Sequence, residues 1–380
     1  MNFEPLKHFL DTCLPSLGIP GSDTVIYKGH EEVFRYQSGY DSIRLGTPVR
    51  PDALYHMYSI TKVSTCVAAA QLIERGEITV NDPISAYFPE YRNIRVKVKN
   101  PDGTEEIRPA KTQLLVKHLL SMTSGLDYNI NRSGIERVKR ETDGRCPTLD
   151  IVRALAEDPF IFDPGTDYRY SLSLDVIGGL VELVSGMKLS DYMRENIFLP
   201  LGMNNTSFGL TDGKLERMAT QYTYEKGHAV EIAKDYNQFV FGSEYDSGGA
   251  GLISTVDDQI LLADALTHFG VGKNGNRILS SAATKLMRTN LLDDGQYKSF
   301  NSIKQVVGYG YGWGVRTNMH PEEAGNLMPV GEFGWDGAKL SYISSCPESG
   351  ISIFHAEHMG NLHGTVIPRL RNVIYSCLDD

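Results

Sequence analysis

The sequence predicts an α/β chain of the α+β kind, in which an antiparallel sheet flanked by helices carries an inserted, mostly helical domain. Strand-like patterns bounded by glycine and proline occur near both ends of the chain, and each end also contributes an apolar helical pattern. The middle consists of short helical patterns and long loops. We therefore expect residues 1–79 and 241–380 to form a discontinuous α/β domain, residues 80–240 to form the inserted domain, and an active site to lie in the cleft between them.

The N-terminal part of the expected sheet is a hairpin followed by a core helix. Residues 24–36, TVIYKGHEEVFRY, indicate two strands joined at Lys28 and Gly29. The next segment has apolar side chains at steps of three and four, as in a buried helix. These apolar positions are Ile60, Val63, Val67, Ala70 and Ile73. Gly76 follows as a C-terminal stop.

Helical and strand patterns continue through the middle and the C-terminal part. KHLLSMTSG (117–125) and SLDVIGGLVELVSG (173–186) are the clearest helical segments of the middle. AKLSYISSC (338–346) and SGISIFHAEH (349–358) are typical of strands. A closing helix is predicted because one face collects apolar residues, namely Val366, Ile367, Leu370, Val373, Ile374 and Cys377.

Composition excludes several classes of partner. The 380 residues carry 37 Lys and Arg against 47 Asp and Glu, a net charge of -10, and no basic run along which a phosphate backbone could lie. The N-terminal segment interrupts its apolar residues with charged ones, unlike a secretory signal. No apolar stretch approaches the roughly 20 residues that cross a bilayer. We expect a cytoplasmic protein with a small-molecule substrate and no nucleic-acid or membrane partner; its oligomeric state is left open.

The cysteines indicate neither disulfides nor a metal. Their number is odd and their spacing wide, at Cys13, Cys66, Cys146, Cys346 and Cys377. The absence of a CxxC motif or a Cys/His cluster argues against a disulfide framework and against a zinc site. We therefore predict reduced, mostly buried thiols, no metal and no cofactor.

A serine and a lysine stand one turn apart at the start of the predicted core helix. Ser59 and Lys62 share a helix face, and the helix N-terminus favours negative charge on the hydroxyl. A serine nucleophile needs a base, and a lysine serves only if burial or a neighbouring cation lowers its pKa. The chain contains a second S-x-x-K, Ser185 to Lys188, beside Gly186 at a helix C-terminal end, where the dipole has the wrong sign.

Two further stretches extend this candidate site. Tyr170 precedes an apolar helix, in a loop from which a phenol could reach a serine and lysine in a cleft. Gly337 and Ala338 lie at the start of a predicted strand, where small residues let a substrate approach the backbone. The structural alternatives are a packed tyrosine and a β-turn.

Together, in this order, these stretches resemble the serine β-lactamase and penicillin-binding-protein superfamily, specifically its class C-like branch, which also holds family VIII-type esterases and acyltransferases. Ser59 and Lys62 match the nucleophile motif, Tyr170 matches the tyrosine of the Y-x-N motif, and WDG (335–337) takes the place of K-T-G. KHLLSMTSGL, SGGAGLISTVDD and GYGYGWGV resemble connecting segments of the family, so the similarity spans nearly the whole chain. The resemblance implies a β-lactamase/transpeptidase-like fold.

The resemblance also implies a mechanism. Ser59 Oγ would attack a carbonyl while Lys62 and Tyr170 move its proton, and the resulting acyl-enzyme would be resolved by water or another acceptor. The backbone N–H groups of Ser59 and Ala338 would form the oxyanion hole. Which of Lys62 and Tyr170 is the resting base stays open.

Two departures from the family pattern bear on the substrate. Leu172 stands where the family has asparagine, and Trp335 replaces the K-T-G lysine that would pair with the carboxylate of a β-lactam. We predict a serine hydrolase, foremost a carboxylesterase acting on small or apolar acyl esters. The alternatives are an acyltransferase using the same acyl-enzyme, a weak β-lactamase or D-amino-acid peptidase, and a non-catalytic binding protein of this fold.

Other residues are candidates for the pocket rather than for the chemistry. Tyr128, Trp313 and Asp336 are expected to line it, with packing as the alternative. His355 and His358 have the spacing of metal ligands, but a third ligand is missing, and we interpret them as structural or pocket-lining.

Overall fold

The computed structural model describes residues 1–100, 102–210, 213–360 and 362–378. Its largest sheet has eight strands in the order β11-β12-β13-β14-β15-β1-β2-β3, and all neighbouring pairs are antiparallel. The strands are β1 (Gly21–Lys28), β2 (Glu31–Ser42), β3 (Thr47–Pro48), β11 (Tyr309–Tyr311), β12 (Arg316–Asn318), β13 (Phe333–Asp336), β14 (Tyr342–Cys346) and β15 (Ile351–Ala356). The predicted antiparallel sheet, built from both ends of the chain, is confirmed.

The predicted N-terminal hairpin is also present, with its turn one residue later than expected. Lys28 pairs with Glu31, so the turn residues are Gly29 and His30 rather than Lys28 and Gly29. Both have positive φ, 58° and 72°, as a two-residue hairpin turn of type I′ requires. Glycine adopts this conformation freely, whereas His30 is an unusual residue for it.

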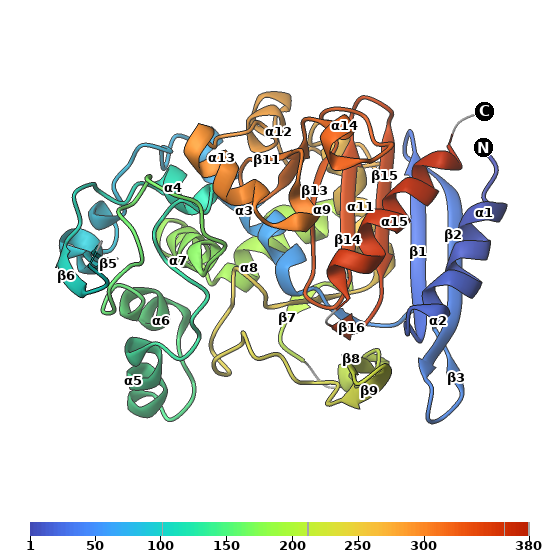
Figure 1. The fold of residues 1–380 in the computed structure, drawn as a ribbon, viewed down its shortest axis with the longest axis horizontal. Coiled ribbons are helices and arrows are strands. Elements are labelled where there is room, and N and C mark those ends of the chain that lie inside the picture. The colour runs from blue at the N-terminus through green and yellow to red at the C-terminus, as the bar shows by residue number, and fades with distance from the viewer. Residues whose placement is uncertain (101, 211–212, 361, 379–380) are drawn as a thin grey trace.

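Helices cover both faces of the sheet (Figure 1). Helix α11 (Val256–Thr267) contacts β1, β14 and β15. On the other face lie α1 (Glu4–His8) and α15 (His363–Ser376), which is the predicted closing helix. The two ends of the chain meet, because the Asn2 amide donates a hydrogen bond to the Cys377 carbonyl at 3.0 Å.

Most of the remaining helices lie beside the sheet (Figure 1). The remaining helices are α2 (Leu14–Ser16), α3 (Thr61–Glu74), α4 (Val116–Leu120), α5 (Ser133–Glu141), α6 (Thr148–Ala154), α7 (Ser173–Ser185), α8 (Leu189–Met193), α9 (Leu199–Leu201), α10 (Lys214–Arg217), α12 (Ser281–Met287), α13 (Asp294–Asn301) and α14 (Pro321–Ala324). The smaller sheets contain β4 (Tyr55–His56), β5 (Arg95–Lys99), β6 (Glu105–Pro109), β7 (Ser207–Phe208), β8 (Gln221–Glu225), β9 (His228–Ile232), β10 (Leu252–Ser254) and β16 (Met359–Gly360). The division into an outer and an inserted domain stays a prediction.

Helix α3 runs through the interior of the molecule. Every residue from Thr61 to Leu72 is buried, so the helix has no polar face to show to water. It packs against α7, and Gly76, at φ 71°, follows its end as predicted. The site built at its start is therefore anchored in the rigid core.

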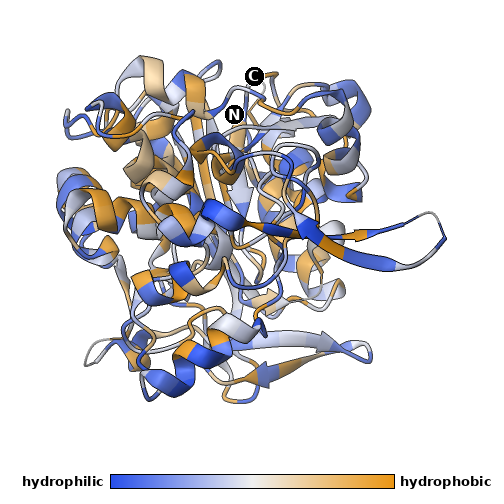
Figure 2. Cartoon of the chain, turned by 90° about the vertical axis from the view of Figure 1, so that its left-hand side faces the viewer, coloured by the Kyte–Doolittle hydropathy of each residue, from blue (hydrophilic) through white to orange (hydrophobic). Residues whose placement is uncertain are grey.

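Burial follows hydropathy along the other elements. Figure 2 shows hydrophobic and hydrophilic residues alternating along the helices, as expected for elements with one face in the core. The five cysteines are free thiols and four of them are buried, as predicted. In the described part of the chain, no helix combines the length and the apolar character needed to cross a membrane.

Candidate active site

Ser59 stands on a strained backbone turn. Tyr58–Ile60 form a short 3₁₀ helix that leads directly into α3, so Ser59 lies at the N-terminus of a continuous helical segment. Tyr58 has a φ of 46°, a left-handed conformation that side chains rarely adopt, and its hydroxyl donates a hydrogen bond to Gln221 Oε1 at 2.6 Å. Ser59 is 9% exposed. The turn thus presents one hydroxyl from an otherwise buried helix.

Lys62 is fully buried and points to Ser59. Its Nζ donates hydrogen bonds to Ser59 Oγ at 3.3 Å, Tyr128 Oη at 3.1 Å and the Gly249 carbonyl at 2.7 Å. These bonds use all three protons of an ammonium group. Burial lowers the pKa of Lys62, but the Tyr128 and Tyr170 phenols and a nearby carboxylate outweigh burial and hold the pKa above its ordinary value. Lys62 is therefore a cation at neutral pH.

That carboxylate is Asp175, which acts on Lys62 through a peptide group. Asp175 Oδ1 accepts hydrogen bonds from Tyr245 Oη at 2.7 Å, Ser247 Oγ at 2.7 Å and the Gly249 amide at 3.2 Å. The carbonyl of the same Gly249 accepts from Lys62. A Cβ at Gly249 would collide with the carboxylate, so only glycine fits there. Sequence reasoning missed both residues, although Gly249 lies in the SGGAGL segment.

Tyr170 is held beside Lys62 by stacking and by a hydrogen bond. Its ring centroid is 4.8 Å from Lys62 Nζ, and its ring stacks on Tyr128 with centroids 5.4 Å apart. Trp335 stacks on the other side, also at 5.4 Å, and its Nε1 donates a hydrogen bond to Tyr170 Oη at 3.0 Å. The structure therefore brings Tyr170 together with Ser59 and Lys62 from a separate stretch of the chain.

The end of β13 lies against the Ser59 turn. A Cβ at Gly337 would stand 2.7 Å from the Met57 carbonyl oxygen and would collide with Ser341 Oγ, so this approach requires glycine. Ala338 follows on the pocket side and lines the same pocket as Ser59. Among the described residues, its N–H has no hydrogen-bond acceptor. An unpaired amide on a residue that lines the pocket of a nucleophile suits a negatively charged oxygen.

The Ser59 pocket has a volume of about 360 Å³ and is mainly aromatic and aliphatic. Its walls are formed by Ser59, Tyr128, Tyr168, Tyr170, Phe239, Phe300, Ile303, Gln305, Val306, Trp335, Asp336 and Ala338. The predicted lining residues Tyr128, Trp335 and Asp336 are among them. The sequence does not identify Tyr168, Phe239 and the segment 300–306 as pocket walls, because the spacing of an aromatic or aliphatic residue does not distinguish a pocket wall from core.

Asp336 is not a free carboxylate in this pocket. Arg371 Nη2, on α15, donates to Asp336 Oδ1 at 2.9 Å and to Oδ2 at 3.0 Å. Arg371 is buried; burial lowers the pKa of its guanidinium, but Asp336 and the Tyr309 and Tyr342 phenols outweigh burial and raise it. The ion pair links the closing helix to the strand end that carries Trp335.

Two predicted pocket residues lie elsewhere. Leu172 is the N-cap residue of α7 and is buried in the hydrophobic core, because its side chain packs inward where the helix begins. Trp313 lines a different pocket of about 620 Å³, together with Ile73 and His118. Gly337 is buried beneath Ala338. We therefore do not retain Leu172 or Trp313 as substrate-binding residues. Ser59 does not line the third pocket either, which has a volume of about 680 Å³.

His355 and His358 are structural residues, which is the first of the two interpretations given from the sequence. His355 is fully buried, with Nδ1 2.7 Å from Thr24 Oγ1 and Nε2 2.8 Å from Glu357 Oε1. His358 Nε2 accepts a hydrogen bond from the His56 amide at 3.2 Å. Burial, followed by the charge of His56, lowers the pKa of His358 well below its ordinary value, which keeps this ring neutral as an acceptor.

Sheet, helices and site together define a class of protein. The antiparallel sheet covered by helices, with a serine, a lysine and a tyrosine gathered beside it, is the β-lactamase/transpeptidase-like fold. A family model described as Beta-lactamase matches residues 6–356. The chain belongs to this family, and the resemblance inferred from its motifs is confirmed.

The chain is also similar to proteins named as esterases and acyltransferases. Esterase EstB of Burkholderia gladioli is 26% identical over 359 residues, covering 87% of this chain and 84% of that protein. Acyltransferase calJ of Penicillium decumbens is 27% identical and covers 81% of this chain and 76% of that protein. The solved structure of EstCE1, described as a hydrolase with promiscuous acyltransferase activity, superposes with a TM-score of 0.79 at 24% identity and covers 98% of both chains. The structural likeness supports the fold.

Proposed function

We propose that this protein is a serine carboxylesterase that forms an acyl-enzyme at Ser59. The observation that carries the proposal is the position of Lys62 Nζ, 3.3 Å from Ser59 Oγ and 4.8 Å from the centre of the Tyr170 ring. A serine at the start of a helix, a buried cation and a phenol at these distances are the parts that acyl transfer through serine needs. The similarity to EstB points to the same reaction class.

The proton of Ser59 moves through the pair formed by Lys62 and Tyr170. Because Lys62 is already protonated, its charge stabilises an oxyanion on Ser59 or Tyr170 and it cannot itself accept a further proton. We assign that role to Tyr170: its oxygen takes the Ser59 proton as Oγ attacks the ester carbonyl, and its own phenolic proton passes to the oxygen of the leaving alcohol, whose bond to the carbonyl carbon breaks. The N–H groups of Ser59 and Ala338 hold the tetrahedral oxygen meanwhile. Water then attacks the acyl-enzyme by the reverse sequence.

The pocket favours an uncharged acyl group. Its described lining includes no lysine or arginine, and the carboxylate that it does include, Asp336, is already paired with Arg371. Trp335 fills the position of a cation that would bind the carboxylate of a β-lactam. Discrimination of this kind amounts to several kcal/mol when a charged ligand loses its partner, roughly 2 to 5 kcal/mol. Small or apolar acyl esters are therefore the proposed substrates.

The test is hydrolysis of p-nitrophenyl butyrate by the wild type, Ser59→Ala and Ser185→Ala. The chain provides this control itself, because Ser185 begins the second S-x-x-K motif at the last residue of α7, away from the pocket. We expect kcat/KM of Ser59→Ala to fall by at least about 1,000-fold and that of Ser185→Ala to stay unchanged. Equal rates for the wild type and Ser59→Ala would overturn the proposal.

Acyl transfer to an alcohol is the second candidate, and the similarity to calJ favours it. It uses the same acyl-enzyme and differs in which nucleophile resolves it. Incubation with p-nitrophenyl butyrate and increasing concentrations of a primary alcohol, followed by product analysis, separates the two. An ester product that dominates over free butyrate at low millimolar alcohol would identify a transferase; free butyrate throughout would identify a hydrolase.

A further inference from the structure

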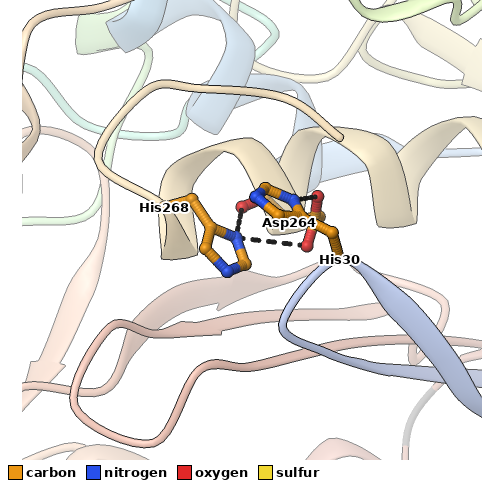
Figure 3. A group of neighbouring side chains, drawn as sticks. All are labelled: His30, Asp264 and His268. Carbon is orange, nitrogen blue, oxygen red and sulfur yellow. Dashed lines mark hydrogen bonds and ion pairs between the residues drawn. The ribbon is translucent and has the colours of Figure 1, made fainter. Parts of the chain in front are cut away.

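A cluster of two histidines and an aspartate lies where the β1–β2 turn meets the end of α11 (Figure 3). His30 is the second turn residue, Asp264 lies in the last turn of α11, and His268 is the C-cap residue of the same helix. His30 Nδ1 is 2.7 Å from Asp264 Oδ2, and His268 Nδ1 is 3.3 Å from Oδ1. One donor atom from each residue lies within 4.8 Å of the others.

The aspartate of this cluster is a buried carboxylate without a permanent counter-ion. Its side chain is 0% exposed, and in the described part of the chain its ion partners are the two histidines. Oδ1 receives no hydrogen bond, so a lone pair of a buried oxygen is left open. Burial of a carboxylate is unfavourable unless a cation or hydrogen bonds compensate it. A positive charge against this oxygen would compensate the buried carboxylate.

The two imidazoles are placed to hold that charge. Asp264 and His268 are four residues apart on one helix, so their side chains share a face. His30 reaches them from the hairpin in its left-handed conformation, and its ring stacks on that of His268 with centroids 3.6 Å apart. The side chains of His30 and His268 are 34% and 23% exposed, which leaves the cluster open to an ion from solvent.

We propose that His30, Asp264 and His268 form a zinc-binding site that joins the β1–β2 hairpin to helix α11. Two imidazole nitrogens and one carboxylate oxygen suit Zn²⁺ rather than Mg²⁺ or Ca²⁺, which prefer all-oxygen sites. Each imidazole supplies one nitrogen lone pair and water supplies the fourth ligand. His30 Nδ1 now faces the Asp264 carboxylate and His268 Nδ1 the Asp264 backbone carbonyl, at 2.8 Å, so a ring nitrogen that carries a proton there passes it to the other nitrogen of the same ring, or a charged ring releases one proton to solvent, before that nitrogen binds the metal. The site is structural, since none of its residues lines the Ser59 pocket.

This inference goes against the prediction of no metal made from the sequence. His30 lies 234 residues before Asp264, so no local spacing connects them. Only the register of the β1–β2 hairpin, one residue later than predicted, brings His30 into the turn. The pattern that did have metal-like spacing, His355 and His358, is occupied by internal hydrogen bonds instead.

Zinc titration of the tag-free protein by calorimetry tests the proposal, with His30→Asn, His268→Gln and, as control, His228→Asn. Asparagine tolerates the left-handed conformation of residue 30, and His228 is an exposed histidine remote from the cluster in sequence. We expect one zinc per wild-type chain with a Kd of about 10 µM or tighter. Each cluster variant should bind at least about 10-fold more weakly, and His228→Asn should bind as the wild type does.

Thermal unfolding supplies the second measurement. Zinc at about 100 times the wild-type Kd should raise the Tm of the wild type and of His228→Asn by roughly 2 to 5 °C, and that of His30→Asn by about half as much or less. Circular dichroism verifies that the variants are folded. Absence of zinc binding by the wild type up to about 1 mM, or binding that both cluster variants retain in full, would overturn the proposal. Neither readout depends on esterase activity, so the two proposals fail independently.

Discussion

At the scale of single residues, Trp335 gains a role that its replacement of a lysine does not suggest. The substitution removes a cation, but the indole also stacks on Tyr170 and donates a hydrogen bond to its oxygen. An N–H donor stabilises negative charge on that oxygen and fixes its direction. Trp335 is therefore a positioning residue for Tyr170 in the proposed reaction, as well as a wall of the pocket.

Replacing Trp335 by phenylalanine tests this role. The variant keeps an aromatic ring against Tyr170 and loses only the indole N–H, so we expect kcat for p-nitrophenyl butyrate to fall by about 10-fold, the equivalent of one hydrogen bond. Trp313→Phe is the matched control, because Trp313 is the other of the two tryptophans and lines a different pocket. Equal kcat values for the two variants would contradict the role.

A second prediction at this scale concerns the effect of Asp175 on the pKa of Lys62. Its carboxylate helps to hold the pKa of Lys62 above the ordinary value, so Asp175→Asn should lower that pKa. Activity that requires the Lys62 cation is lost as pH rises through its pKa, and this loss should therefore begin at lower pH in the variant. A pH–rate profile carried from pH 6 to the alkaline limit at which the protein stays folded checks it, and the wild type should keep its activity to higher pH than the variant. A basic limb identical to that of the wild type would show that Asp175 does not act on Lys62.

The residues that could be predicted from the sequence are those that belong to a motif. Ser59, Lys62 and Tyr170 have fixed spacing and order, and the structure brings them together. Asp175 and Gly249 could not be found, because their contribution is a contact between two distant segments that only packing creates. Leu172 is predicted to bind substrate because it occupies the asparagine position of the Y-x-N motif. That position does not determine whether the side chain of a helix N-cap residue turns toward the pocket or, as here, toward the core.

At the scale of elements, helix α4 depends on a neutral histidine. His118 Nδ1 accepts a hydrogen bond from the Leu115 amide at the start of this helix. Burial, reinforced by the charge of Lys117, lowers the pKa of His118 to about 4. In the unfolded chain the ring gains its proton near pH 6.5, so between pH 6.5 and 4 the unfolded state binds more protons and stability falls as pH falls.

His118→Gln should remove this dependence. Glutamine does not titrate and is a preferred residue at this position of a helix start, three residues after the N-cap. We expect the wild type to lose about 1 to 2 kcal/mol more than the variant between pH 7 and pH 4.5, after allowance for solvent screening. Urea unfolding at the two pH values measures the difference, with His228→Gln as control. Parallel losses in all three proteins would contradict the assignment.

The pair formed by Arg371 and Asp336 links two elements near the pocket. Arg371→Leu should destabilise the protein by about 3 to 5 kcal/mol, because Asp336 would keep its charge without the buried partner. The exposed pair formed by Arg137 and Glu157 provides the comparison, and Arg137→Ala should change stability by about 1 kcal/mol or less. Chemical unfolding measures both. Similar values for the two variants would show that the Arg371 pair is no stronger than a surface one.

Element positions were predicted where periodicity was strong. Helices α3 and α7 and strands β14 and β15 match the predicted segments, and α15 begins three residues before the first predicted apolar position, because the apolar patterns reflect burial directly but do not mark the helix start. The hairpin turn was placed one residue too early, since the glycine at position 29 marks the turn but not which neighbour shares it. That single-residue difference moves His30 from a strand to the turn that faces α11.

At the scale of the whole molecule, the fold could be predicted because motifs from both ends of the chain had to converge on one site. The antiparallel sheet joins the N-terminal hairpin to the C-terminal strands through the pairing of β1 with β15. This closure packs α3 inside the molecule and sets the Ser59 turn against the end of β13. The walls formed by Tyr168, Phe239 and the segment 300–306 could not be predicted, because only the complete fold brings these segments to the pocket.

The most direct test of the account is covalent trapping of the nucleophile. The folded protein is treated with a diethyl p-nitrophenyl phosphate probe, and intact mass and peptide mapping locate the adduct. We predict one diethylphosphoryl group per chain, on Ser59, absent from Ser59→Ala and formed much more slowly in Tyr170→Phe. An adduct on a different residue, or equal labelling of the wild type and Ser59→Ala, would contradict the central claim that Ser59 is the acylated serine.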